Sequence, residues 1–393
     1  MTFEAFLVGG VRTPNGRYGG TLRDTKVVQL GALVGRAALE RAGLDADLVD
    51  EAIVSNCRQA GNGPNPGRQM ALRAGLGETV PAQTVNMACA SGLKVLDLAR
   101  QSLAVGSAGI VLAISAESMS TMPFLAPSTL RWGGARRGDI TLFDGWRDGG
   151  TDPVCDMNMG ETAEKVAREF GISRRAQDEW SVRSHQRVAA AWDEGRFADQ
   201  VVPVETPLGI LETDEGLRRD STLDRLAALK PSFADGGTVT AGNASQMADG
   251  AASILVASAG AVERSGLTPR ARIRSFAQVG VDPTMMGIGP TRAIPLAVER
   301  AGLSIADIDL FEINEAFGAQ IVQNVRELKL DEDKVNVNGG GIALGHPTGQ
   351  SGLRLVVTLL AELERRDLRL GVASLCVGGG MGVAAVIERV AAR

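Results

Sequence analysis

The segment Ala38-Leu-Glu-Arg-Ala-Gly-Leu44 recurs almost letter for letter as Ala297-Val-Glu-Arg-Ala-Gly-Leu303. A second pair follows in the same order and at nearly the same offset, because Ser91-Gly92-Leu93 returns as Ser351-Gly352-Leu353. Chance matches would not stay colinear in this way. The repeat therefore indicates an internal duplication of one domain, and the rest of the chain is interpreted around it.

Both copies alternate helix-like and strand-like patterns. In the first copy, apolar residues between positions 27 and 38 fall at helical spacing, and residues 51–55 and 110–115 have the composition of short buried strands. A third repeated pair, residues 109–119 and 371–381, carries the strand pattern into the second copy. This alternation predicts an α/β fold of two duplicated halves, each with crossover connections and a mainly parallel sheet.

The segment between the two copies has no counterpart and a different composition. It begins with clusters of Trp, Arg, Asp and Gly-Gly, and it continues with charged helices expected over residues 161–170 and 173–192, the second capped by Ser173. We interpret it as an inserted lid or ligand-binding subdomain. The expected division is a first half of residues 1–118 and 250–268, a loop domain of residues 119–249 and a second half of residues 269–393.

Composition narrows the class of protein. The chain has 393 residues, of which 44% are hydrophobic and 22% charged, so it can bury a sizeable interior and should form two to three domains. Its net charge of -5 argues against nucleic-acid binding and against a basic membrane-surface protein. No apolar run approaches the roughly 18 to 20 residues of a membrane span. We therefore expect a soluble cytoplasmic protein without membrane or nucleic-acid partners.

Metal chemistry is not expected. The chain has only four cysteines, without Cys-x-x-Cys spacing, and two histidines. This pattern predicts neither a disulfide framework nor a thiolate zinc site, and a multi-histidine metal site cannot be assembled. These six residues are Cys57, Cys89, Cys155, Cys376, His185 and His346.

Cys89 lies between a strand expected over residues 80–85 and a helix that begins in the run Ala88-Cys89-Ala90-Ser91-Gly92. A thiol at a helix N-terminus faces unpaired N–H groups and the positive end of the helix dipole, so its thiolate is favoured. Cys89 is therefore a candidate nucleophile. The alternative at this position is a small buried core residue.

His346 lies in the glycine-rich run of residues 338–352, where glycines permit close approach of the backbone to a ligand. Pro347 favours an extended conformation for the histidine. A phosphate cradle is disfavoured because no Gly-Lys-Ser/Thr follows, whereas a histidine bound in a structural turn stays open. His185, inside a charged helix and flanked by side chains that favour solvent, is expected to be structural.

Two further positions are candidates for chemistry. Cys376 precedes Gly378-Gly-Gly380, so it is either an acid or base beside bare backbone amides or a core residue at a strand end. Asn314 follows a strand expected over residues 308–313, where it would orient a water or simply cap a helix. Cys57 and Cys155 have no such surroundings and are expected to be structural.

Taken together, these motifs resemble the thiolase family. The likeness runs from the first expected strand to the last in the family's order, and the combination is far more specific than any single motif. The matching segments are Arg12-Thr-Pro-x-Gly16, Asn86-x-x-Cys89-x-Ser-Gly-Leu93, Gly242-Asn-Ala-Ser245, Asp249-Gly-Ala-Ala252, Asn314-Glu-Ala-Phe317, Gly345-His-Pro-x-Gly349 and Cys376-x-Gly-Gly-Gly380.

The resemblance implies a thiolase-like α/β fold with a layered α-β-α-β-α core and an inserted loop domain. It implies that Cys89 accepts an acyl group, that His346 takes the thiol proton and helps to bind the thioester oxygen, and that Cys376 moves a proton on the α carbon of the second substrate. Asn314 would hold a water in one oxyanion hole. The backbone amides of Cys89 and Gly378 would form the other. Claisen condensation of acetyl-CoA and thiolytic cleavage of 3-ketoacyl-CoA, with ping-pong kinetics, would be the two directions of one reaction.

By the same resemblance, Ser245 near the pantetheine, Arg218 near the nucleotide and Met159 are expected to contact substrate. Coenzyme A thioesters would be substrates, so no separate cofactor and no metal are implied. The assembly would be a homodimer or a homotetramer built as a dimer of dimers. Gln246 and Asn158 depart from acetoacetyl-forming members and resemble chain-shortening ones, so the acyl-chain preference stays open.

Two other functions remain as alternatives. One is a non-catalytic acyl-CoA or lipid-binding relative that keeps the fold for its pocket. The other is a decarboxylating ketoacyl synthase, whose chemistry needs a second histidine in the active site, and His185 is badly placed for that role. The intact Cys89, Asn314, His346 and Cys376 motifs favour the thiolase.

Overall fold

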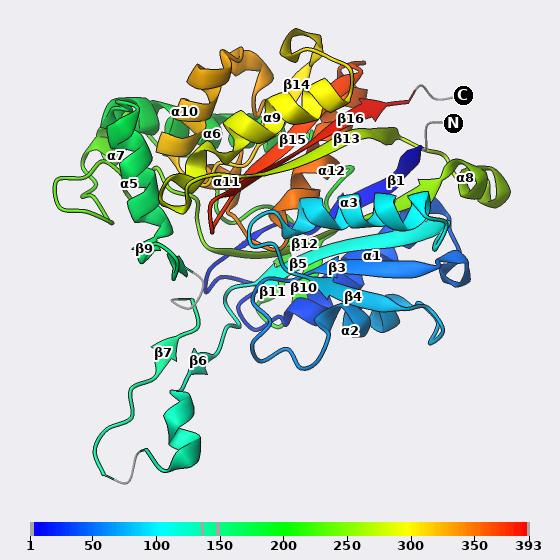
Figure 1. Cartoon of the computed structure of the whole chain (residues 1–393), viewed down its shortest axis with the longest axis horizontal. Helices are drawn as coiled ribbons and strands as arrows, with labels where there is room; N and C mark the ends of the chain where they lie inside the picture. The colour runs from blue at the N-terminus through cyan, green and yellow to red at the C-terminus, as the bar shows by residue number, and fades with distance from the viewer. Residues whose placement is uncertain (1–3, 135–136, 147–149, 391–393) are drawn as a thin grey trace.

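A computed structural model describes residues 4–134, 137–146 and 150–390 of the chain. Within these residues, none of the helices combines the length and the apolar character that a membrane crossing requires. The two duplicated halves lie one above the other in Figure 1, with the inserted segment at one end and both termini at the opposite end.

The core is built on a mixed sheet of ten strands. The first half supplies β1 (Ala5–Arg12), β2 (Gly16–Arg17), β3 (Glu51–Ser55), β4 (Ala82–Val85), β5 (Ile110–Ser118) and β12 (Ala248–Ser258). The second half supplies β13 (Ala271–Gly280), β14 (Leu310–Ile313), β15 (Leu370–Val377) and β16 (Met381–Arg389). The strand order is β14-β15-β16-β13-β1-β12-β5-β3-β4, with β2 paired to β12.

The expectation of a mainly parallel sheet in each half is wrong. Only the pairs β3–β4, β3–β5 and β14–β15 are parallel, and the other pairs within this sheet are antiparallel. The reason lies in the connections. β15 and β16 are joined directly by the Gly378–Gly380 turn, and the long insert returns the chain to β5 as the antiparallel β12.

Helices form three layers around the two halves of the sheet. On the outer face of the first half lie α1 (Val27–Ala42) and α2 (Pro66–Ala74). On the outer face of the second half lie α9 (Gly289–Arg300) and α10 (Gly318–Leu328). Between the halves lie α3 (Ser91–Ala104) and α12 (Ser351–Arg365), whose apolar side chains join both halves in one core. The order of layers is α-β-α-β-α, as the resemblance implies.

The duplication is visible in the hydrogen bonds. Asp50 Oδ2 accepts the N–H groups of Gly109 and Ile110 at 2.7 and 2.9 Å. Asp309 Oδ2, in the second half, accepts the N–H groups of Arg369 and Leu370 at 3.0 and 2.8 Å. Asp50 thus stabilises the start of β5, and Asp309 stabilises the start of β15. The two strands occupy equivalent positions in the two halves.

The repeated Ser-Gly-Leu motifs meet where α3 and α12 begin. A Cβ added to Gly92 would lie 2.9 Å from the backbone nitrogen of Leu353, and one added to Gly352 would lie 2.1 Å from that of Leu93. Real Cβ atoms are not found at such distances, so both positions require glycine. The two helix N-termini are therefore held side by side at the centre of the molecule.

Within the described residues, the insert contains two long α-helices, one α-helix of five residues and three short hairpins. The helices are α5 (Met159–Glu169), α6 (Arg174–Asp193) and α7 (Leu223–Ala227), and Ser173 caps α6 by accepting the N–H of Ala176 at 3.2 Å. The hairpins are β6 (Phe124–Leu125) with β7 (Phe143–Asp144), β8 (Thr151–Asp152) with β9 (Met157–Asn158) and β10 (Val204–Thr206) with β11 (Gly209–Leu211). In Figure 1 the β6–β7 segment projects away from the core as an arm.

Candidate active site

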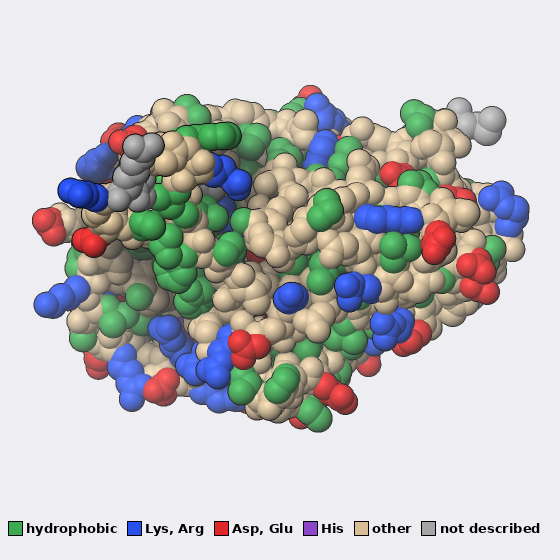
Figure 2. All heavy atoms as spheres, turned by 90° about the horizontal axis from the view of Figure 1, so that it is seen from below, with side chains coloured by type: hydrophobic (Ala, Val, Ile, Leu, Met, Phe, Trp, Pro, Cys, Tyr) green, Lys and Arg blue, Asp and Glu red, His purple; other side chains and the backbone are tan. Residues whose placement is uncertain are grey.

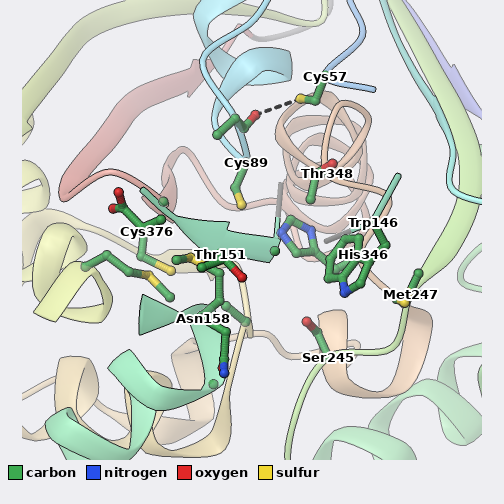
Figure 3. Close-up of a pocket in the computed structure, with 18 of the residues that line it drawn as sticks. Cys57, Cys89, Trp146, Thr151, Asn158, Ser245, Met247, His346, Thr348 and Cys376 are labelled. Carbon is green, nitrogen blue, oxygen red and sulfur yellow. Dashed lines mark hydrogen bonds between the residues drawn. The ribbon is translucent and has the colours of Figure 1, made fainter. Parts of the chain in front are cut away.

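A cavity of about 650 Å³ lies where the two halves and the insert meet. Cys89, His346 and Cys376 all line it, although they come from three different parts of the chain. Figure 3 shows their side chains directed toward the same space. The structure thus brings together the three groups that the sequence analysis assigned to one active site.

Cys89 sits in a tight turn between β4 and α3. The preceding residue, Ala88, has a φ of 45°, which is unusual for a side chain other than glycine. The carbonyl of Ala88 is held by two donors, because it accepts the Ser91 hydroxyl at 2.7 Å and the Cys57 thiol at 3.0 Å. Ser91 Oγ also accepts the N–H of Met87 at 2.7 Å. These bonds fix the strained turn that presents the Cys89 sulfur to the cavity.

The protonation state of Cys89 differs from the expectation. The helix terminus predicted a favoured thiolate, but burial raises the pKa of the Cys89 thiol above its ordinary value. The N–H of Gly378 and the N–H of Cys89 itself act in the opposite direction, because they hydrogen-bond to the sulfur. The cost of desolvating the thiolate exceeds these gains. Cys89 is therefore a thiol and needs a base.

His346 is oriented to be that base. Its Nδ1 lies 2.6 Å from the hydroxyl of Ser351, and that hydroxyl lies 3.0 Å from the carbonyl of Pro347. Because the hydroxyl has one proton and the carbonyl can only accept it, Ser351 accepts from Nδ1–H. Nε2 is then the unprotonated nitrogen, and Asn314 Nδ2 lies 3.3 Å from it.

The charge state of His346 agrees with this geometry. Burial, together with the positive charges of Arg354 and Arg58, lowers the pKa of His346 to about 3. The imidazole is therefore neutral at physiological pH and able to accept a proton. Asn314 is fully buried, and α10 begins four residues later with Phe317 at its N-cap, so Asn314 is not a helix cap. Its Oδ1 has no hydrogen-bond partner among the described residues and is available to a water or a ligand.

Cys376 is the third group of the cavity. It is the last but one residue of β15 and lies beside Met159 and Phe317 in a small apolar cluster. Burial raises the pKa of the Cys376 thiol well above its ordinary value, and the nearby Cys89 raises it as well. Cys376 is therefore a neutral thiol that has a proton to give. The N–H of Gly378, two residues further on, faces the sulfur of Cys89.

The expected substrate contacts divide into two groups. Ser245 and Met159 line the cavity, as do Asn158 and Gln246. Gln246 also joins three loops. Its side-chain Nε2 donates to the carbonyls of Gly216 and Ile342 at 2.8 and 3.0 Å. Its backbone carbonyl accepts the N–H of His346 at 2.9 Å. Arg218 does not line the cavity and lies on the exposed surface two residues after Gly216.

His185 is buried, whereas the sequence placed it among solvent-favouring neighbours. The arginines that flank it, Arg183 and Arg187, are themselves partly buried, and the Nδ1 of His185 accepts the N–H of Arg218 at 3.1 Å. It does not line the cavity. The cavity thus has one histidine, His346.

Three residues near the site were not found from the sequence. Cys57, which we expected to be structural, lines the cavity and supports the Cys89 turn through its hydrogen bond to the carbonyl of Ala88. Arg58 also lines the cavity, and its guanidinium lies 5.3 Å from the ring centroid of Trp146. Glu117 lies buried behind the cavity. Nothing in the local sequence marks these positions, because their partners lie far along the chain.

The arrangement can perform covalent acyl transfer. It offers a thiol nucleophile, a neutral imidazole base, a second thiol that carries a proton and backbone N–H groups directed at the reacting sulfur. Among the described residues, there is no group of three or more His, Cys, Asp or Glu side chains that could hold a metal ion.

Comparison with known proteins agrees with this chemistry. Residues 5–260 match the family described as "Thiolase, N-terminal domain", and residues 267–389 match "Thiolase, C-terminal domain". The acetyl-CoA acetyltransferase of Cupriavidus necator is 47% identical over 98% of this chain and 99% of its own, and that of Escherichia coli is 47% identical over 98% of both chains.

Solved structures give the same result. The structure of the acetyl-CoA acetyltransferase of Bacillus anthracis matches with a TM-score of 0.95 and 41% identity over 99% of both chains. The structure of human mitochondrial 3-ketoacyl-CoA thiolase in complex with CoA matches with a TM-score of 0.96 and 40% identity over 99% of this chain and 98% of that one.

Proposed function

The chain belongs to the thiolase family, and from this membership we propose that it exchanges acyl groups between coenzyme A thioesters through an acyl-Cys89 intermediate. In one direction it condenses two acetyl-CoA molecules, and in the other it cleaves a 3-ketoacyl-CoA with free coenzyme A. The observation that carries the proposal is the convergence of Cys89, His346 and Cys376 on one cavity.

In the cleavage direction, His346 Nε2 takes the proton of Cys89 while the sulfur attacks the 3-keto carbonyl. The charge that develops on the oxygen is stabilised by hydrogen-bond donors around it. The bond between C2 and C3 then breaks, and Cys376 gives its proton to C2, which releases acetyl-CoA. The raised pKa of Cys376 supports this role, because the thiol starts with the proton that the leaving carbon needs.

In the second half of the reaction, free coenzyme A gives its thiol proton to the Cys376 thiolate and attacks the acyl group on Cys89. The Cys89 sulfur leaves and takes back the proton held by His346. Both cysteines return to thiols, so the cycle closes without a metal or a separate cofactor. Condensation is the same sequence in reverse.

We assign the remaining contacts by their position. Ser245 and Met159 lie in the cavity wall, within reach of the pantetheine arm and the acyl group. Arg218, at the exposed surface, would meet the nucleotide end of coenzyme A, where a guanidinium suits a phosphate. The bonds of Gln246 to Gly216 and Ile342 support this, because they join the loop that leads to Arg218 to the loop that carries His346.

The alternatives have less support. A non-catalytic acyl-CoA or lipid binder does not need a base directed at a thiol in a strained turn. A decarboxylating ketoacyl synthase needs a second histidine, and His185 points away from the cavity and is occupied by the N–H of Arg218.

The proposal extends to assembly, domain division and location. We propose a homodimer or homotetramer, because the projecting arm of residues 119–146 exposes large apolar side chains such as Phe124 and Trp132. We keep the division into residues 1–118 with 250–268, 119–249 and 269–393. Its first boundary coincides with the end of β5 at Ser118, and its second lies two residues after β12 begins at Ala248. A cytoplasmic location is supported by the bacterial relatives.

The test is thiolysis of acetoacetyl-CoA and longer 3-ketoacyl-CoA thioesters by free coenzyme A. We expect turnover with ping-pong kinetics, and a fall of roughly a thousandfold or more in kcat for Cys89→Ala. The substrate with the largest kcat/KM reports the acyl-chain preference. No cleavage at any chain length, or full activity of Cys89→Ala, would refute the proposal.

A further inference from the structure

Glu117 is the last but one residue of β5 and has no exposed surface. Its carboxylate accepts five hydrogen bonds, which come from two separate segments of the chain. The first segment, residues 56–58, donates Asn56 Nδ2 at 2.6 Å, Cys57 N at 3.2 Å and Arg58 N at 3.0 Å. The second segment, residues 348–349, donates Thr348 Oγ1 at 2.8 Å and Gly349 N at 2.9 Å.

All five partners are donors, so both oxygens of Glu117 must accept. Only an ionised carboxylate can do this, because a carboxamide would turn an NH2 group toward at least one N–H. Hydrogen bonds to an ionised acceptor are also roughly twice as strong as neutral ones. The bonding pattern thus selects a carboxylate at this position and disfavours the neutral isostere.

The first segment leads to the nucleophile. Cys57, whose N–H is held by Glu117, donates its thiol to the carbonyl of Ala88 at 3.0 Å. Ala88 is the residue with positive φ directly before Cys89. Figure 3 shows the bond from Cys57 above the Cys89 side chain. Glu117 therefore supports the turn that holds the nucleophile.

The second segment leads to the base. Thr348 and Gly349 follow His346 and Pro347 directly, so Glu117 holds the downstream end of the His346 loop. The fit is tight, because a Cβ added to Gly349 would lie 2.8 Å from the carbonyl of Ala116 and 3.0 Å from Glu117 Oε2. The carbonyl of Gly349 is also bound, by the hydroxyl of Ser55 at 2.7 Å.

We propose that Glu117 is a positioning residue that keeps the Cys89 turn of the first half in register with the His346 loop of the second half. This proposal rests on the proposed function, since it concerns the distance between the nucleophile Cys89 and the base His346. Glu117 touches neither Cys89 nor His346, and it acts through Cys57 on one side and Thr348 on the other.

The test compares Glu117→Gln with wild type and with Asp97→Asn. Asp97 is a matched control, because its buried carboxylate accepts three side-chain donors on α3 but does not line the cavity. For Glu117→Gln we expect kcat to fall about a hundredfold with KM nearly unchanged, since an error of about 1 Å in the placement of reacting groups has an effect of this size. Asp97→Asn should keep kcat within about threefold, as expected for a site outside the reaction geometry.

A second measurement does not depend on turnover. The negative charge of Glu117 raises the pKa of Cys89, so the pH at which iodoacetamide reacts half-maximally with Cys89 should fall in Glu117→Gln and stay unchanged in Asp97→Asn. If wild type itself fails to cleave thioesters, the proposed function fails while this alkylation profile still reports on Glu117.

A third variant covers the case in which Glu117→Gln does not fold. Thr348→Val removes one donor and leaves the carboxylate with its other four, and we expect kcat to fall about tenfold, a loss matching one hydrogen bond to a charged group. If Glu117→Gln folds, a wild-type kcat together with an unshifted alkylation profile would overturn the proposal. If Glu117→Gln does not fold, a wild-type kcat in Thr348→Val would overturn it.

Discussion

The imidazole of His346 and the thiols of Cys89 and Cys376 are all uncharged. Burial is the common cause, since it lowers the pKa of the histidine and raises the pKa of each cysteine. The site thus holds a neutral thiol and a neutral imidazole, in contrast to the favoured thiolate that the helix terminus suggested. Charge appears only when substrate brings its own electrophile and oxyanion contacts.

This charge state predicts the pH dependence. The pKa of His346 falls from 6.5 to about 3, so in the folded protein its base form persists far below pH 6.5. We expect kcat/KM for thiolysis to show no acid limb near pH 6.5, and Cys89 alkylation in the free enzyme to accelerate only as the pH rises toward the thiol pKa. The unfolded chain binds a proton at this histidine below pH 6.5 and the folded chain does not, so His346 lowers stability as the pH falls through that window.

A pH series of both rates, at constant ionic strength, checks this prediction. His346→Ala is the useful comparison, because it should lower kcat by roughly a hundredfold or more through loss of the general base. Rapid alkylation of Cys89 that persists unchanged at about pH 5 would indicate a preformed ion pair and would contradict the account.

At the scale of elements, the centre of the fold is the contact between α3 and α12. The sequence marked these two positions as a shared Ser-Gly-Leu repeat but did not predict that they are in contact. Periodicity predicted α1 and the strands of the first half well. It did not predict strand direction, since direction depends on how long connections return, as the insert does between β5 and β12.

The close contact between α3 and α12 predicts that one added methyl group at Gly352 strongly lowers the stability of the fold. Gly352→Ala would place its Cβ against the backbone nitrogen of Leu93, so α12 must shift away from α3. We expect the free energy of unfolding to fall by about 1–3 kcal/mol, as for other overpacked sites. Activity should fall as well, because both helices begin beside the cavity.

Denaturant unfolding of Gly352→Ala and Gly280→Ala measures this. A Cβ added to Gly280 meets nothing within 4 Å, and its φ is not in the left-handed region, so this control should leave stability nearly unchanged. Equal stability of the two variants would show that α3 and α12 are not as tightly packed as the structure has them.

The candidate site could be predicted in part for similar reasons. Cys89, His346 and Cys376 each stand beside glycines, and this local pattern, together with the family resemblance, marked them. Glu117 and Cys57 have no such neighbours. Their roles depend on hydrogen bonds to residues far along the chain, such as Gly349 and Ala88, and these contacts exist only after both halves have folded around α3 and α12.

At the scale of the whole molecule, the projecting arm is the feature least explained by a single chain. Trp132 is 85% exposed and Phe124 is 68% exposed, which is unusual for large apolar side chains so close in sequence. Figure 2 shows hydrophobic side chains gathered at this end of the molecule, with Lys and Arg beside them. A second copy that covers the arm would remove this exposure, which supports the proposed oligomer.

Substitutions in the arm test the assembly. We expect Phe124→Asp with Trp132→Asp to lower the molar mass measured by light scattering after size exclusion, because loss of buried aromatic anchors weakens an interface by about 2 kcal/mol or more each. Val105→Asp is the control, since Val105 is 80% exposed at the end of α3, away from the arm. A mass that is the same for the double variant and wild type would remove the arm from the interface.

The most direct test of the account is to find the acyl group. Wild-type protein mixed with acetyl-CoA, quenched in acid and digested should contain one acetyl group per chain, on Cys89. Cys376→Ala should lose condensation, because the thiol that moves the proton at the α carbon is missing, and it should take up the acetyl group more slowly, because the same thiol gives its proton to the coenzyme A that leaves. Absence of the label, or its presence on Cys57 or Cys376 in place of Cys89, would contradict the account.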